Sequence, residues 1–362
     1  MQLVDWRLAA ATGTRLVPPG PTIALADALA TVEDLHRIAD TADQHVARVT
    51  GLDAASKSAA TVVVDRPDWI RANVESFQVL VDPIIEALMT SKSVNPPGAL
   101  AAAIGSRVAG IEVGVVLSYL GTRVLGQFEL LGPPRSAAGE HAPGRLTLVA
   151  PNIVAAERAL QVQPADFRLW VCLHEVTHRT QFGAAPWLHA HVQDLLREYL
   201  LASDLDTNVV LERLRQALSG LAQVARGQRE ASLVELIQTP AQKEILDRIT
   251  GLMSLLEGHA DVVMDTVGPS VVPSVATIRA RFDRRRRQAN PLSRIVRRLL
   301  GLEMKLKQYA EGAVFVRAVI DEVGMPGLNT VWTAPGQLPT AAEIRDPKLW
   351  LKRVGLPPAV SA

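Results

Sequence analysis

Apolar residues recur at helical spacing through the N-terminal part of the chain. In the segment 24–50 they fall on one face, with polar residues opposite, at Val32, Leu35, Ile38, Ala42, Val46 and Val49. The sequence DRP at 65–67 is typical of a helix start, and a helix through about residue 89 is expected after it. The NPPG break at 95–98 precedes an Ala-, Gly- and Val-rich segment, 99–126, whose length and few charges predict a buried helix.

Strand-like sequence is confined to short runs. FELL at 128–131 and RLTLVA at 145–150 are expected to be strands, and the segment between them is rich in Gly and Pro. The run TVVV at 61–64 is also β-branched, but FELL and RLTLVA are the only runs that convincingly indicate β-structure. From residue 152 onward the pattern is helical almost to the end of the chain. The expected fold class is therefore mainly α with a small β-sheet.

Composition narrows the class of protein. The formal net charge of the 362 residues is +1, so overall charge favours no particular partner. Cys172 is the one cysteine, so no intrachain disulfide is possible. Asp5, Arg7 and Arg15 interrupt any signal-peptide core, and no charge-free apolar run approaches the roughly 20 residues that span a bilayer. We therefore expect a cytoplasmic protein without a membrane span.

The sequence HEVTH at 174–178 offers the clearest candidate chemistry. Residues four apart in a helix share one face, about 6 Å apart along the axis, so His174 and His178 can bind one Zn²⁺ ion. Glu175 is rotated about 100° from His174 and can take a proton from a water molecule that the metal has acidified. The apolar run 169–173 before the motif indicates a buried helix, in which polar side chains are costly without partners. The alternative is an ordinary helix with unrelated polar residues.

A catalytic zinc site usually has three protein ligands, so a third is expected elsewhere in the chain. The metzincin pattern is excluded, because Gln181 and Ala184 stand where it requires Gly and His. The segment LLEGHADVVMD at 255–265 places Glu257 and Asp261 on one helical face. This is the gluzincin arrangement, in which the glutamate binds zinc and the aspartate orients a histidine ligand.

Helix geometry sets aside two other polar residues near the expected ligands. His259 can bind zinc by its chemistry, but it points about 200° away from Glu257, which leaves Glu257 as the expected ligand. Cys172 lies about 200° round its helix from His174, which predicts a buried structural thiol. The alternative for 255–265 is an ordinary acidic helix face. The apolar flanks LMSLL and VVM indicate instead that it is buried, where carboxylates need partners.

HEVTHRTQF together with LEGHADVVMD resembles a zincin-like hydrolase family of actinobacteria and their relatives. The similarity extends to VDRPDWIRANVESF, SYLGTRVLGQFELL and GLNTVWTAPGQLPTAAEIRDPKLWLKRV, and it covers nearly the whole chain. One branch of that family is named for its association with the biosynthesis of a deazaflavin coenzyme. The resemblance implies a zincin-like helical fold and a metal site formed by His174, His178 and Glu257. It implies no particular substrate.

Further residues have weaker claims on function. His189 and Tyr309 are candidate cleft residues that could donate hydrogen bonds to a transition state, with ordinary polar positions as the alternative. The strand RLTLVAPN could bind an extended substrate by strand addition, or it could be plain core structure. The basic run 279–307 could bind nucleic acid or an acidic membrane, but it is nearly free of stacking aromatic residues. We expect it to be a solvated helical face.

These features predict a zinc-dependent, metallopeptidase-like hydrolase in which Glu175 is the general base for attack on a peptide or amide carbonyl. The alternatives are a catalytically silent, metal-stabilised binding or regulatory protein, and a helical nucleic-acid-associated protein that uses 279–307. We expect an N-terminal helical region at 1–126, a zincin-like catalytic region at 127–325 and a C-terminal tail at 326–362 that packs on the body. One continuous domain is the alternative organisation.

Overall fold

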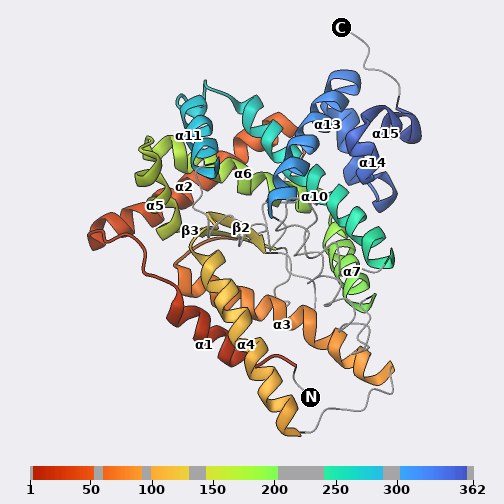
Figure 1. Ribbon diagram of the computed structural model, residues 1–362. Helices are drawn as coiled ribbons and strands as arrows, with labels where there is room; N and C mark the ends of the chain where they lie inside the picture. Colours follow the sequence, from red (N-terminus) through yellow and green to blue (C-terminus); the bar gives the residue numbers. More distant parts are fainter. Residues whose placement is uncertain are drawn as a thin grey trace, which may run out of the picture. The chain divides into compact units, whose positions relative to one another are not determined.

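The computed structural model describes residues 3–52, 60–91, 99–129, 144–202, 240–287 and 302–356. The helices of this part of the chain are α1 (Trp6–Leu16), α2 (Leu25–Thr50), α3 (Arg66–Ser91), α4 (Ala99–Gly121), α5 (Ala150–Leu160), α6 (Pro164–Ala184), α7 (Trp187–Leu201), α10 (Pro240–Val267), α11 (Val275–Arg287), α13 (Leu302–Leu328), α14 (Ala341–Arg345) and α15 (Pro347–Val354). Two short 3₁₀ helices, η2 and η3, span Asn329–Trp332 and Pro335–Gln337. The strands are β1 (Thr61–Val64), β2 (Gly126–Glu129) and β3 (Arg145–Val149). The expected class, mainly α with a small sheet, is confirmed (Figure 1).

The chain folds as two compact units. The first contains Met1–Pro186 and Val263–Phe282, and the second contains Trp187–Val262 and Asp283–Ala362. Helix α10 is continuous and supplies residues to both units. Its last turns belong to the first unit, which also holds the sheet and α6.

The sheet of the first unit has the strand order β1-β3-β2. Strand β1 pairs with β3 in parallel, with Thr61 opposite Leu146, and β2 pairs with β3 in antiparallel, with Gly126 opposite Leu148. The TVVV run was not expected among the convincing strands, because its four β-branched residues show no alternation and become a strand only against β3. The observed β2 also begins two residues earlier than the expected strand 128–131.

The central strand β3 separates two hydrophobic cores, because its side chains alternate between the faces of the sheet. Leu146 and Leu148 contribute to the core formed with α2, α5, α6, α11 and the end of α10. Val149 contributes to the other core, with α1, α3 and α4. Figure 1 shows these two sets of helices on opposite sides of the sheet. Helix α6, which carries the HEVTH sequence, is therefore held between the sheet and the core helix α2.

Helix α4 differs from its prediction. It packs on α1 through glycines, because a Cβ at Gly110 would lie 2.5 Å from the Asp5 carbonyl oxygen and one at Gly114 would lie 2.7 Å from that of Ala9. The rest of its surface is largely exposed, so the prediction of a buried helix was wrong. An apolar composition shows that a helix needs covering, but it does not show which of its faces is covered. Within the described residues, Ala103–Gly121 is the one segment long and apolar enough to cross a membrane, by length and composition alone.

The second unit contains a backbone-to-backbone crossing of α10 and α13. A Cβ at Gly258 would lie 2.2 Å from the carbonyl carbon of Gly312, and a Cβ at Gly312 would lie 1.9 Å from the Ser254 carbonyl oxygen. Only glycine at both positions permits this contact, which fixes the height and rotation of α10 at this point. Glu257, the predicted third ligand, is the residue immediately before Gly258.

Candidate metal centre

The HEVTH sequence lies in the middle of a firmly anchored helix. Pro164 is in the first turn of α6, where proline costs no hydrogen bond. Asp166, in the same turn, accepts hydrogen bonds from the backbone N–H and the hydroxyl of Ser274 at 2.9 and 2.6 Å. On the apolar side of the helix, Leu173 and Val176 are completely buried in the core with the sheet. These contacts leave little freedom for the motif to rotate.

Two arginines on α6 tie the helix to its neighbours. The Arg179 guanidinium is buried, pairs with Asp43 of α2 and donates to the Thr61 hydroxyl at 2.9 Å. Arg168 pairs with Glu157 of α5 at 2.8 Å and with Asp34 of α2 at 2.9 Å. Both ion pairs are mostly shielded from solvent, so losing one partner would leave a poorly hydrated charge. The histidines of the motif are thus carried on a rigid element.

The two histidines of the motif point at one another. Their Nε2 atoms are 3.2 Å apart, and the ring planes are inclined at 87°. Two imidazole nitrogens on one tetrahedral zinc ion, each about 2.0–2.1 Å from it, would be about 3.3–3.4 Å apart. The observed separation of His174 and His178 therefore fits a shared ion.

Gln181 holds the second of these histidines. The Nδ1 atom of His178 lies 2.9 Å from Gln181 Oε1, and the glutamine side chain is fully buried. An amide oxygen can only accept, so Nδ1 carries the proton and the lone pair of Nε2 is left for a ligand. From the sequence, Gln181 served only to exclude the metzincin pattern, and its contact with His178 was not predicted. Its spacing of three residues from His178 was the available signal.

Glu257 completes a group of three potential ligands. His174, His178 and Glu257 each offer a ligand atom, and these atoms all lie within 4.8 Å of one another. All three side chains are half-buried. Helix α10, which carries Glu257, packs its later residues Val263 and Met264 into the same core as α6. The structure thus brings together the three residues expected to bind metal, and two imidazoles with one carboxylate are a donor set that suits zinc.

Glu175, the expected general base, is 8% exposed and lies against the first residue of β2. A Cβ at Gly126 would be 2.6 Å from its Cγ and 2.7 Å from its Cδ. Glycine at the start of β2 therefore makes the space that the glutamate occupies. No local sequence signal pointed to Gly126, because the contact depends on how the sheet meets α6.

Other expected residues lie as follows. Asp261 is half-buried on α10, one turn after Glu257, and His189 is half-buried on α7. The side chain of Tyr309 is outside the described residues. His259 is fully buried, and its ring lies 5.5 Å from that of Trp332.

Cys172 is fully buried in the core, as predicted. Burial raises the pKa of its thiol, and the charge of Glu175 adds to this effect.

Part of the basic run 279–307 makes ion pairs and hydrogen bonds within the first unit. Arg279 pairs with Asp265 at 2.7 Å, and Arg281 donates to the Leu160 carbonyl at 2.9 Å. The residues 288–301 of this run are outside the described part of the chain.

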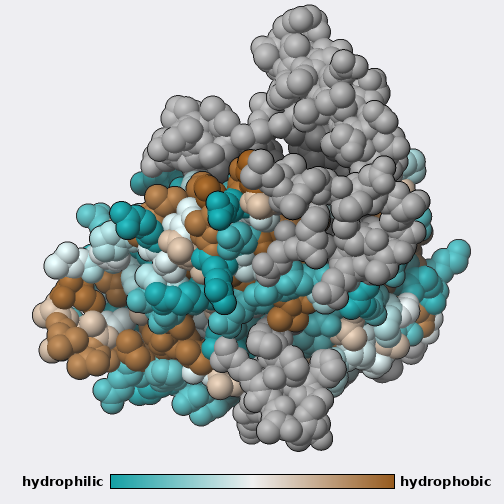
Figure 2. Space-filling view, turned by 90° about the horizontal axis from the view of Figure 1, so that it is seen from below, coloured by the Kyte–Doolittle hydropathy of each residue, from teal (hydrophilic) through white to brown (hydrophobic). Residues whose placement is uncertain are grey.

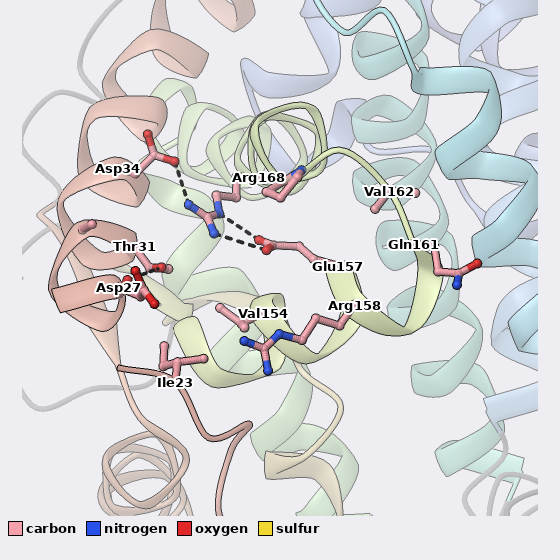
Figure 3. Close-up of a pocket in the computed structure, with 12 residues that line it drawn as sticks. Ile23, Asp27, Thr31, Asp34, Val154, Glu157, Arg158, Gln161, Val162 and Arg168 are labelled. Carbon is pink, nitrogen blue, oxygen red and sulfur yellow. Dashed lines mark hydrogen bonds and ion pairs between the residues drawn. The ribbon is translucent and has the colours of Figure 1, made fainter. Parts of the chain in front are cut away.

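A separate hollow lies among α2, α5 and the first turns of α6 (Figure 3). Arg168 crosses it to reach Asp34 and Glu157, and Arg158 and Asp27 stand along its rim. None of the residues that line it belongs to the group of potential ligands. This hollow is therefore not the candidate metal centre.

Comparison with known proteins identifies the class. The sequence pattern of the zincin-like metallopeptidase family matches residues 4–351, and the chain belongs to that family. A similar solved structure comes from Chloroflexus aurantiacus and is described as "a putative hydrolase with a novel fold". It has 31% sequence identity and a TM-score of 0.68, and the match covers 97% of this chain and 99% of that one. No protein with a curated description matches.

Proposed function

We propose that this protein is a zinc-dependent hydrolase that cleaves peptide or related amide bonds. The observation that carries the proposal is the geometry of the ligand group. The Nε2 atoms of His174 and His178 are 3.2 Å apart, and a Glu257 oxygen completes a set within 4.8 Å. Membership of the zincin-like metallopeptidase family supports the same chemistry.

In this proposal each residue of the group has one task. His174, His178 and Glu257 would hold the ion, and Gln181 keeps His178 in the tautomer that can bind it. A bound Zn²⁺ would supply a Lewis acid and lower the pKa of water toward neutrality. Glu175 takes the proton from the attacking water and later delivers it to the leaving amine. Asp261 is proposed to orient one of the histidines from behind.

The sheet offers a place for an extended substrate. The segment RLTLVAPN was a candidate for binding it, with plain core structure as the alternative, but β3 is central, and both of its edges are taken by β1 and β2. Of the two alternatives, the position of β3 favours core structure. Among the described residues β2 is an edge strand, and its first residue, Gly126, touches Glu175. A peptide added to the edge of β2 would run past the general base.

The proposal is tested with Glu175→Gln. This change removes the base and no ligand, so zinc content should be unchanged while cleavage falls at least about 100-fold. The substrate probe is a mixture of random-sequence peptides, with products read by mass spectrometry. Glu244→Gln, which alters an exposed carboxylate on α10, is the matched control and should retain full activity.

Two outcomes would redirect the assignment. Cleavage by Glu175→Gln at the wild-type rate would refute the role of Glu175 as general base. A wild-type protein that binds zinc but cleaves no peptide would instead favour the silent, metal-stabilised binding protein. A buried carboxylate beside the ligand group argues against that alternative, because a structural zinc site needs no base.

A further inference from the structure

Helix α4 presents a row of exposed apolar side chains. Ile104, Val108, Ile111 and Val115 are 56%, 49%, 45% and 47% exposed. They are separated by four, three and four residues, which is the spacing of the contact positions in a two-helix coiled coil. We call these four residues the α4 stripe. On the face of the molecule seen from below, apolar side chains gather in patches between polar ones (Figure 2).

The α4 stripe is distinct from the contact that α4 already makes. Gly110 and Gly114 face α1, with close approaches to the backbone of Asp5 and Ala9. At 100° per residue, the centre of the stripe lies roughly 110° round the helix from these glycines. The helix is therefore covered on one side by α1 and exposes a second apolar side. A helix that is apolar on most sides is normally covered on most sides.

Two charged residues identify what could cover the stripe. Arg107 and Glu112 are both exposed and flank the stripe on opposite sides, each about 70° from its centre. In the coiled-coil pattern that the stripe defines, Arg107 immediately precedes the contact residue Val108, and Glu112 immediately follows the contact residue Ile111. They are five residues apart. In a parallel pair of helices these are the two positions that meet across the interface.

We propose that the α4 stripe binds the α4 stripe of a second copy of this chain, with the two helices parallel. A two-fold axis along the helices would bring Arg107 of each copy to Glu112 of the other, so a single complementary pair is used twice. The four apolar residues of each copy would then be buried against one another. Neither the metal centre nor the proposed hydrolysis is needed for this contact.

The same charges argue against a lipid bilayer as the occupant. Insertion of the exposed face of α4 into hydrocarbon would carry Arg107 and Glu112 with it, near the middle of the stripe, which is costly. An interfacial helix would instead be expected to carry basic residues along its polar rim. A positively charged residue on one flank of the stripe and a negatively charged residue on the other are what pairing with a second helix of the same sequence requires.

The first test measures the size of the full chain by sedimentation velocity over a range of concentrations. The wild type should sediment as a dimer of the 39.0 kDa chain, and Ile111→Lys should sediment as a monomer. Leu29→Lys is the matched control, because Leu29 is an equally apolar residue of α2 with 63% exposure, and it should remain dimeric. A monomeric wild type, or an Ile111→Lys variant that still dimerises, overturns the proposal.

A second test does not depend on one substitution folding well. Arg107→Glu and Glu112→Arg should each weaken dimerisation roughly tenfold or more, because two opposite-charge contacts become like-charge contacts. Mixing the two variants should restore the dimer, since each supplies the charge that the other lacks. No recovery on mixing refutes the parallel pairing. A chain that is monomeric alone but floats with phosphatidylcholine–phosphatidylserine vesicles would show that the stripe binds membrane and would also refute it.

Discussion

Replacement of Gln181 by leucine should weaken zinc binding without changing any ligand. Gln181 Oε1 lies 2.9 Å from His178 Nδ1 and is the acceptor that fixes the tautomer of this ring. Loss of such a partner typically lowers metal affinity roughly 10- to 100-fold, or about 1.4 to 2.8 kcal/mol. Because Gln181 is fully buried, water cannot readily supply a new acceptor. We therefore expect the upper half of this range for Gln181→Leu.

The assay is a competition for zinc between the protein and a chromophoric chelator. Thr177→Val is the matched control. Thr177 is buried on the same helix beside His178, and its hydroxyl donates to the Leu173 carbonyl at 2.7 Å, so this variant also loses a buried hydrogen bond. Gln181→Glu keeps an acceptor and should retain most of the affinity. Equal zinc affinities for Gln181→Leu and Thr177→Val would refute the role assigned to Gln181.

Two further predictions concern the surroundings of Glu175. Gly126→Ala would place a Cβ 2.6 Å from Glu175 Cγ, so peptide cleavage should fall about 100-fold at unchanged zinc content. Gly105→Ala, where nothing lies within 4 Å, is the control, and equal activities would count against the contact. Burial raises the pKa of Cys172, so its thiol stays protonated and covered at pH 8 and should react with a disulfide reagent only in denaturant. Rapid reaction of the native protein would contradict this burial.

The sequence was most informative where a structural signal is local. The helix predicted for 24–50 matches α2, Leu25–Thr50, because helical periodicity needs no knowledge of the rest of the fold. Of its predicted apolar face, Leu35, Ile38, Ala42 and Val46 are buried, whereas Val32 is exposed. The proline in the sequence AAP at 184–186 is likewise a local signal for a helix break, and it falls between α6 and α7. The motif spacing predicted that His174 and His178 would face one ion, because four residues make about one helical turn.

The features that the sequence did not predict depend on contacts between distant segments. Strand β1 is too short to be recognised until β3 pairs with it. Gly126 becomes significant only where β2 meets Glu175, and the role of Gln181 depends on its side-chain rotamer. The exposed side of α4 was missed because a nearly uniform apolar composition does not mark the covered face.

Zinc content per chain tests the central claim most directly, with wild type, Glu257→Ala and His259→Ala purified side by side and their folding checked by circular dichroism. We predict about one zinc ion in the wild type and in His259→Ala, and loss of most zinc in Glu257→Ala. Glu257 belongs to the ligand group, whereas His259 packs against Trp332. Zinc that is lost in His259→Ala but kept in Glu257→Ala would contradict the metal centre proposed for this protein.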